Sequence, residues 1–81
     1  MEFSLLVLAI DREIFAGQAI ALCVPAETGV LEVLAGHTPL VAKLKEGDIV
    51  ITTKTGEKTK FPIAGGVLEV KPEGVAALVK F

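Results

Sequence analysis

Turns that contain glycine divide this sequence into short apolar segments, and this division most constrains how the chain can fold. The turns recur about every 8 to 12 residues, which is the spacing of strands in a β-sandwich or barrel. Glycine closes such turns because it adopts positive φ without steric cost. The four turns are Glu27-Thr28-Gly29, Lys45-Glu46-Gly47-Asp48, Lys54-Thr55-Gly56-Glu57 and Pro72-Glu73-Gly74.

The segments between the turns predict β-strands at residues 3–10, 18–24, 30–34, 40–44, 49–53, 58–63, 67–70 and 75–79. The clearest hairpin joins residues 49–53 to residues 58–63 through the turn that contains Gly56. Alternate side chains of a strand point to opposite faces, which here places Lys58 and Lys60 on one face and Thr59, Phe61 and Ile63 on the other. In two packed antiparallel sheets, each strand has one buried face and one face exposed to solvent, as this pattern predicts.

No window of the sequence supports an amphipathic helix. Gly and Pro interrupt every window longer than about a dozen residues after Phe15, and helix caps are missing. Hydrophobic residues make up 52% of the chain but only four are aromatic, and the abundant Val and Ile suit pleated sheets. We therefore expect an all-β fold in which residues 1–81 form a single domain.

Charge, hydropathy and cysteine content exclude several classes of protein. The net charge is −2 and the eight basic residues are scattered, which argues against nucleic acid as the main partner. No apolar run approaches the roughly 18 residues of a membrane helix, and Met1-Glu2-Phe3 lacks the basic start of a secretory signal. A single Cys23 cannot form an internal disulfide, which indicates a reducing compartment.

The residues needed for catalysis or metal binding are too few. The chain has one His (His37), one Cys (Cys23) and one Ser (Ser4), with no paired-ligand spacing. Cys23 lies in an apolar run and is expected to be a small core residue. The turn carboxylates are expected to be solvated surface, and Gly65-Gly66 to allow a bulge or a close strand approach. We expect neither enzymatic activity nor a cofactor.

His37 lies in an inter-strand loop bounded by Gly36 and Pro39, and two interpretations of it stay open. It either hydrogen-bonds its own turn or contacts a partner, since loops on a rigid sheet commonly carry recognition.

Four segments of the chain resemble, in order, the β-sandwich domain of the ATP synthase epsilon subunit. Residues 14–17 resemble its Phe-x-Gly, residues 28–40 its acidic turn leading into Gly-His-x-Pro-Leu, residues 43–49 its Ile-Lys-x-Gly turn, and residues 63–72 its Gly-Gly-hydrophobic-Leu-Glu-Val strand. Together they span residues 14–72, at separations that match the family's.

The resemblance implies a two-sheet antiparallel β-sandwich of about ten short strands, in which residues 14–16 and another short stretch also pair. It implies a non-catalytic rotor subunit of the central stalk, which fastens the gamma subunit to the c-ring so that ion-driven rotation reaches the catalytic head. Such a subunit lies peripherally at the cytoplasmic face of the bacterial inner membrane.

The resemblance also implies two contact regions. Thr28, Gly29, Val30, Leu31 and Glu32 would face the c-ring, with a turn that exposes Val30 and Leu31 beside Glu32. His37, Thr38, Pro39, Leu40 and Ala42 would contact the gamma subunit. Family members often have an acidic residue at the position of Val30 and Gly at that of Glu32, so the charge has moved by two positions and stays on the same strand face.

Family members usually continue into two C-terminal helices, whereas this sequence stops at Phe81. We therefore expect no ATP sensing and no inhibition of the insertion type by this polypeptide, and equilibrium dialysis with ATP tests this.

Three other classes remain as alternatives. A lipoyl or biotinyl carrier needs a modified Lys in a Met-Lys-Met or Asp-Lys-Ala setting, which Thr53-Lys54-Thr55 does not match, and intact mass would reveal an adduct. A small β-fold enzyme lacks its catalytic set. A β-sandwich adaptor that is recruited by strand addition differs only in its partner.

Overall fold

The computed structural model describes all of residues 1–81, and each of its regular elements is a β-strand. This confirms the prediction of an all-β fold. There are nine strands, whereas eight were predicted from the segments and about ten from the resemblance. They are β1 (Phe3–Leu8), β2 (Glu13–Ala19), β3 (Ala21–Ala26), β4 (Gly29–Leu34), β5 (Leu40–Leu44), β6 (Gly47–Thr52), β7 (Lys58–Ile63), β8 (Gly65–Lys71) and β9 (Gly74–Lys80). The structure contains no helix that could cross a membrane.

Hydrogen bonding connects the strands into one curled sheet. Its order is β2-β1-β9-β8-β5-β3-β6-β7, with β4 added alongside β3. All neighbours are antiparallel except β1 and β9, which run parallel. The predicted antiparallel arrangement thus holds at every pair but this one, where the first strand and the last strand of the sequence meet.

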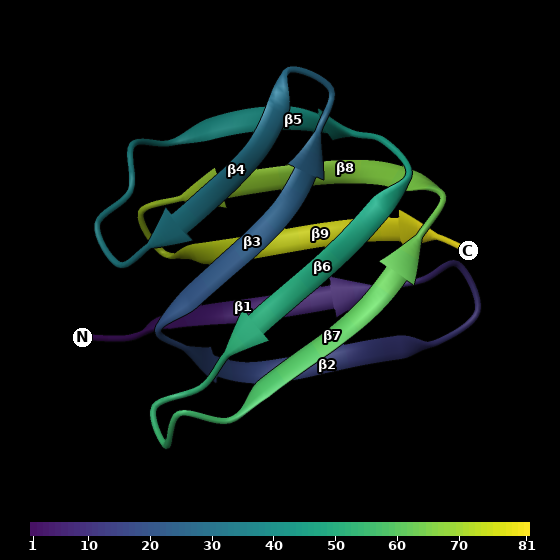
Figure 1. Cartoon of the computed structure of the whole chain (residues 1–81). Coiled ribbons are helices and arrows are strands. Elements are labelled where there is room, and N and C mark those ends of the chain that lie inside the picture. Colours follow the sequence, from purple (N-terminus) through teal and green to yellow (C-terminus); the bar gives the residue numbers. More distant parts are fainter.

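The sheet folds over itself into two layers (Figure 1). Strands β4, β3, β6 and β7 lie across β5, β8, β9, β1 and β2. A single pair, Ala26 with Leu44, joins β3 to β5 at the corner. The molecule is thus a half-barrel with the two packed faces of a sandwich, rather than two separate sheets.

The core lies between the layers and is entirely apolar. Alternate residues of each strand point inward, as the period-2 pattern predicts. No polar or charged residue is buried. Each large buried side chain contributes on the order of 1.5–3 kcal/mol. The core residues are Leu5, Val7, Ala19, Leu22, Val24, Ala26, Val33, Leu44, Ile49, Ile51, Ile63, Leu68, Val70, Val75, Ala77 and Val79.

The strand predicted at residues 18–24 is in fact the end of one strand and the start of another. β2 ends at Ala19 and β3 begins at Ala21, while the Ile20 amide between them donates to the Thr52 carbonyl at 2.8 Å. The chain changes layers here. The expected pairing of residues 14–16 is confirmed in part, since Phe15 and Ala16 pair with β1.

Glycines close the fold at two predicted places. The hairpin of β6 and β7 is confirmed, with Gly56 at φ 88° and its amide donating to the Thr53 carbonyl at 2.9 Å. Phe61 is half-buried and Ile63 buried on one face of β7, while Lys58 and Lys60 are exposed. Thr59, which was predicted on the buried face, is exposed too. The expectation of a close strand approach at Gly65-Gly66 is confirmed too, because β9 runs so close beside Gly66 that a Cβ atom there would meet the Leu78 carbonyl oxygen.

Candidate partner-binding surfaces

The residues that could carry covalent chemistry are held in structural roles. The Ser4 hydroxyl accepts a hydrogen bond from Gln18 Nε2 at 3.0 Å. His37 Nδ1 lies 2.7 Å from the Thr38 carbonyl oxygen, so Nδ1 carries the proton and donates to its own turn. The first interpretation of His37 is therefore correct at this nitrogen. The structure has no cluster of three or more His, Cys, Asp or Glu residues that could hold a metal ion.

The expectation that Cys23 belongs to the core is wrong. Its neighbours along β3, Leu22 and Val24, are buried between the layers, and strand alternation turns Cys23 to the other face. It is half-buried there, opposite Glu32 of β4 and Val50 of β6. The apolar run of residues 19–24 concealed this alternation, because both faces carry apolar side chains.

The segment predicted to contact the c-ring forms the hairpin between β3 and β4. Thr28 is exposed in the turn, and Val30 and Glu32 are exposed on one face of β4, with Val30 81% exposed. Leu31 does not join them, since it is half-buried and packs against the core. The prediction that Val30 and Leu31 are exposed together is therefore wrong, and the exposed pair is Val30 with Glu32.

The segment predicted to contact the gamma subunit also contains both exposed residues and residues that pack against the core. Thr38 and Pro39 are exposed and His37 is half-buried in the β4–β5 loop. Leu40 and Ala42, in contrast, are half-buried and pack against the core from β5. The apolar residue that β5 presents outward is Val41, which is 69% exposed and which the resemblance did not indicate. The spacing of Val41 from Lys43 is the sequence signal that it faces solvent.

Val41 belongs to a larger apolar surface, which we call the outer apolar face. It covers the side of β5, β8, β9, β1 and β2 that points away from the core. Register places most of its members side by side: Leu6 lies between Ala16 and Ala76, and Val67 lies opposite Leu78. Val41 lies at the margin, where Glu69 separates it from Ala76. The members are Leu6, Ala16, Val41, Val67, Ala76 and Leu78, all exposed.

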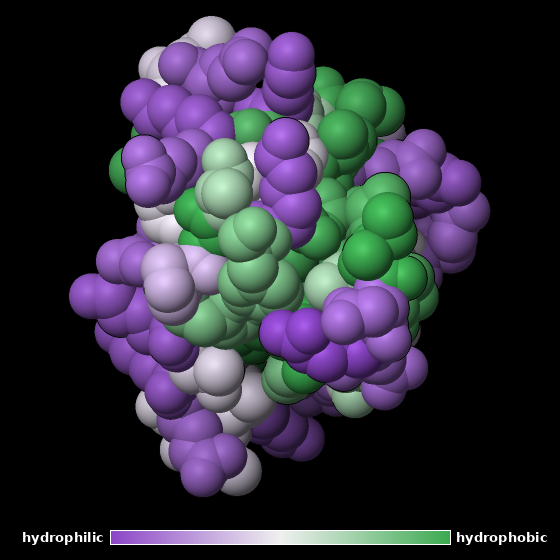
Figure 2. Space-filling view, turned by 90° about the vertical axis from the view of Figure 1, so that its right-hand side faces the viewer, coloured by the Kyte–Doolittle hydropathy of each residue, from purple (hydrophilic) through white to green (hydrophobic).

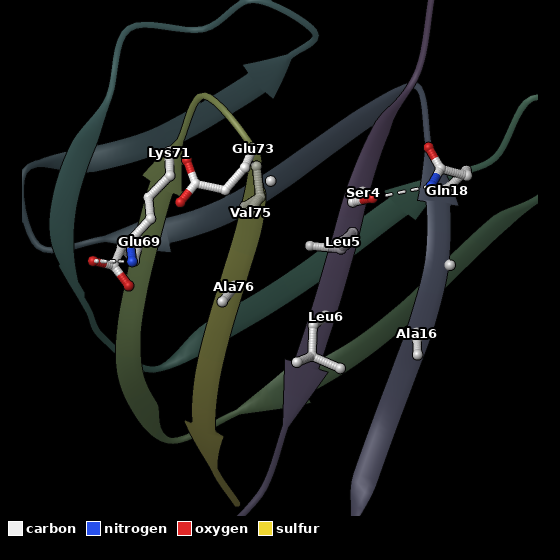
Figure 3. Close-up of a pocket in the computed structure, with 12 residues that line it drawn as sticks. Ser4, Leu5, Leu6, Ala16, Gln18, Glu69, Lys71, Glu73, Val75 and Ala76 are labelled. Carbon is white, nitrogen blue, oxygen red and sulfur yellow. Dashed lines mark hydrogen bonds and ion pairs between the residues drawn. The ribbon is translucent and has the colours of Figure 1, made fainter.

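A shallow groove of about 390 Å³ crosses one end of the outer apolar face (Figure 3). Small side chains form its floor, with Ala16 and Ala76 on either side of Leu6. Polar groups border it, namely the hydrogen-bonded Ser4 and Gln18 and the pair of Lys71 Nζ and Glu69 Oε2, which are 3.6 Å apart.

A second groove connects this end to the predicted His37 loop. It has a volume of about 370 Å³ and is lined by His37 together with Ser4, Gln18, Lys71 and Glu73. The latter four also line the groove of Figure 3. The loop and the outer apolar face thus form one continuous surface, although they are far apart in the sequence.

At the opposite end of the strands, where the C-terminus lies, the surface is also apolar. Figure 2 shows hydrophobic residues running across the middle of this end between hydrophilic areas. A groove of about 450 Å³ is lined there by Ile10, Val67 and Leu78, with Lys43 and Lys80 beside them. Ile10 is 99% exposed. Exposed aliphatic side chains grouped in this way are typical of a surface that binds another protein.

Comparison with known proteins identifies relatives of one kind. Residues 2–80 match the family model described as "ATP synthase, Delta/Epsilon chain, beta-sandwich domain". An ATP synthase epsilon chain of Xanthomonas campestris pv. campestris (strain B100) is 41% identical over 73 residues, which are 90% of this chain and 52% of the relative. An ATP synthase epsilon chain of Stenotrophomonas maltophilia (strain K279a) is 40% identical over 72 residues, 89% of this chain and 51% of the relative. The chain therefore spans about half the length of these relatives.

Solved structures share the fold. A chain of the Euglena gracilis mitochondrial ATP synthase (OSCP/F1/c-ring, rotational state 1) superposes with a TM-score of 0.90 and 25% identity, covering 96% of this chain and 50% of that chain. A chain of the Tetrahymena thermophila mitochondrial ATP synthase (central stalk/c-ring) gives a TM-score of 0.80 and 12% identity, covering 96% and 63%. At 12% identity the second likeness concerns the fold alone.

Proposed function

This chain belongs to the family of the β-sandwich domain of ATP synthase delta/epsilon chains, and from that membership we propose that it is a non-catalytic part of the central stalk. In this role it binds the gamma subunit on one surface and the c-ring on another, so that rotation of the ring turns the shaft. It then lies at the cytoplasmic face of a bacterial inner membrane and is attached there only through the complex.

The outer apolar face is the observation that carries the proposal. Four of its aliphatic side chains are 36–69% exposed on neighbouring strands. Monomeric proteins rarely leave contiguous apolar area uncovered, and such a surface usually marks a protein interface.

We assign the gamma contact to the outer apolar face together with the His37-Thr38-Pro39 loop. The two grooves that share Ser4 and Gln18 make this surface continuous. In this proposal Leu40 and Ala42 act from within, because they anchor β5 to the core and so hold Val41 outward.

We assign the c-ring contact to the β3–β4 hairpin, with Thr28, Gly29, Val30 and Glu32 at the surface and Leu31 anchoring the strand. An apolar side chain beside a carboxylate offers contact area and a charge for a basic loop, a combination common at interfaces. The hairpin lies in the other layer from most of the outer apolar face, so the two partners need not compete.

Size-exclusion co-elution with a purified gamma subunit from the same source tests the proposal. We expect a one-to-one complex with the unchanged chain. Leu78→Lys should weaken it at least about tenfold, because a charge would be buried against the partner. Val30→Lys, a change of similar kind at an exposed residue of β4, should leave the gamma complex intact. Separate elution of the unchanged chain and gamma would refute the role in the stalk and favour an adaptor with another partner.

A further inference from the structure

Three strands of the sheet, β7, β2 and β4, each pair with one neighbour only, and their open edges differ in how they are protected. Strand β7 carries Lys58, Lys60 and Pro62, and β2 is distorted by a register shift against β1 between Val7 and Leu8. Charges, prolines and bulges of this kind discourage the pairing of an edge with a foreign strand. The third edge, β4, pairs only with β3 and has none of these features except a single Glu32.

The backbone of β4 has hydrogen-bonding groups that point away from β3. The Glu27 amide donates to the Lys43 carbonyl at 3.0 Å, and the Lys45 amide donates to the Pro25 carbonyl at 2.8 Å. The residues on either side of Ala26 therefore face β5, and Ala26 itself faces its partner Gly29 on β4. Backbone direction alternates along a strand, so the N–H and C=O groups of Val30 and Glu32 face the open edge.

The side chains at this edge form a symmetrical pattern. Val30 is 81% exposed and Leu34 is 49% exposed, two positions on either side of Glu32. Glu32 is exposed and takes part in none of the ion pairs of the structure. A strand that paired with β4 in either direction would meet an apolar residue, then a carboxylate, then an apolar residue on this face.

We infer that the open edge of β4 receives a strand from a partner protein, and that this strand places Lys or Arg opposite Glu32 between two apolar residues. The backbone groups of Val30 and Glu32 supply the hydrogen bonds, and the side-chain pattern selects the sequence, as in other cases of strand addition. Opposite charges directly across a strand pair stabilise it, whereas like charges destabilise it.

The charge of Glu32 also argues against a second copy of this chain as the occupant. Two β4 strands pairing antiparallel about Glu32 would match Val30 with Leu34 twice, which is favourable, but would set Glu32 opposite Glu32. That central repulsion opposes self-pairing, while a basic residue on a partner removes it.

This inference rests on the proposed function in one respect. Val30 and Glu32 belong to the hairpin assigned to the c-ring contact, so the position of the β4 edge within the complex follows from that assignment. Its test needs neither the gamma subunit nor the ring. The probe is a capped synthetic peptide, Thr-Thr-Val-Thr-Lys-Thr-Val-Thr-Thr, added to the isotopically labelled chain and followed by NMR. We expect shift changes concentrated in residues 29–34 and slower hydrogen exchange of the Val30 and Glu32 amides.

Three matched controls separate the contributions. A peptide with Glu in place of the central Lys should bind at least about fivefold more weakly. The Glu32→Lys variant should reverse that preference. When the peptide pairs antiparallel, its Lys and Val amides face β4, so N-methylation of these amides should abolish binding, whereas N-methylation of the two Thr amides beside the Lys should not. A parallel pairing reverses the two results.

Several results would overturn the inference. These are no binding of the Lys peptide at millimolar concentration, shift changes that map elsewhere, or equal binding by the two N-methylated peptides. Hydrogen exchange of the Val30 and Glu32 amides can also be measured without peptide. If it slows as the chain concentration rises, the edge binds a second copy of the chain instead. Because gamma co-elution can succeed or fail independently, failure of this test does not refute the role in the stalk.

Discussion

Gly66 on β8 lies so close to β9 that a Cβ atom at this position would press against the carbonyl oxygen of Leu78 and come within 3.0 Å of Val79 Cα. The φ of Gly66 is 154°, outside the usual range of other residues. Since Leu78 belongs to the outer apolar face, the shape of that surface depends on the absence of a side chain one strand away.

Gly66→Ala should therefore destabilise the chain by at least about 2 kcal/mol, from the clash and the backbone strain together. Urea unfolding followed by circular dichroism measures the change. Gly36→Ala is the matched control, because Gly36 has φ 80° but nothing within 4 Å of a Cβ, so only strain of about 1 kcal/mol is expected. Equal losses for the two variants would show that the close approach to β9 is unimportant.

Ala76→Arg should separate binding from stability. Ala76 is exposed beside Leu6 in the floor of the groove in Figure 3, so a long charged side chain there would cover the outer apolar face without entering the core. We expect gamma binding by calorimetry to weaken at least about tenfold, with the free energy of unfolding within about 0.5 kcal/mol of the original. Thr55→Arg, in an exposed turn, should alter neither quantity.

The isolated chain should associate with itself at high concentration through the outer apolar face, because that surface is uncovered when no partner is present. Sedimentation velocity over a concentration series measures this. Leu78→Lys should shift the equilibrium to monomer, while Val30→Lys, on the other layer, should not. Strictly monomeric sedimentation of the unchanged chain would contradict the prediction.

Replacing both Lys58 and Lys60 by Thr should make the chain aggregate faster on heating. The two lysines protect the β7 edge, and without them the free backbone groups of this edge lie beside uncharged side chains that do not repel a foreign strand. Light scattering during a temperature ramp gives the rate. Lys54→Thr, in the neighbouring turn, is the control and should leave the rate unchanged. Because Lys60 also pairs with Asp48 at 3.7 Å on the surface, a loss of up to about 1 kcal/mol in stability is expected as well.

Local patterns were sufficient to predict the elements whose two faces differ. In residues 58–63 the charged Lys58 and Lys60 stand on one face and Phe61 and Ile63 on the other, so the strand, most of its inner face and its hairpin partner all followed. The glycine turns predicted most strand ends. The break at Ile20 was missed, because the run from Ala19 to Val24 is apolar throughout and gives no sign that the chain changes layers.

Only some residues of the candidate surfaces could be predicted, again because some strands carry apolar side chains on both faces. Leu31, Leu40 and Ala42 were expected at interfaces but face the core, since apolar neighbours on both faces of a strand hide which face is buried. Glu32 and Lys43 were the available signals, and they place Val30 and Val41 outside. The continuity of the His37 loop with the outer apolar face depends on strands distant in sequence, which no local pattern reveals.

The parallel pairing of β1 with β9 also sets the order in which the molecule can be completed. Leu5 and Val75 are neighbours although 70 residues separate them. During synthesis β1 emerges first and can pair locally with β2, but its other edge must wait for the last strand. Folding is slow when the main contacts join residues far apart in the sequence, because closing the long loop costs entropy before those contacts stabilise the chain. A nascent chain stalled before β9 should thus remain open to proteases along β1 and β8, and become resistant in one step once residue 80 has left the ribosome.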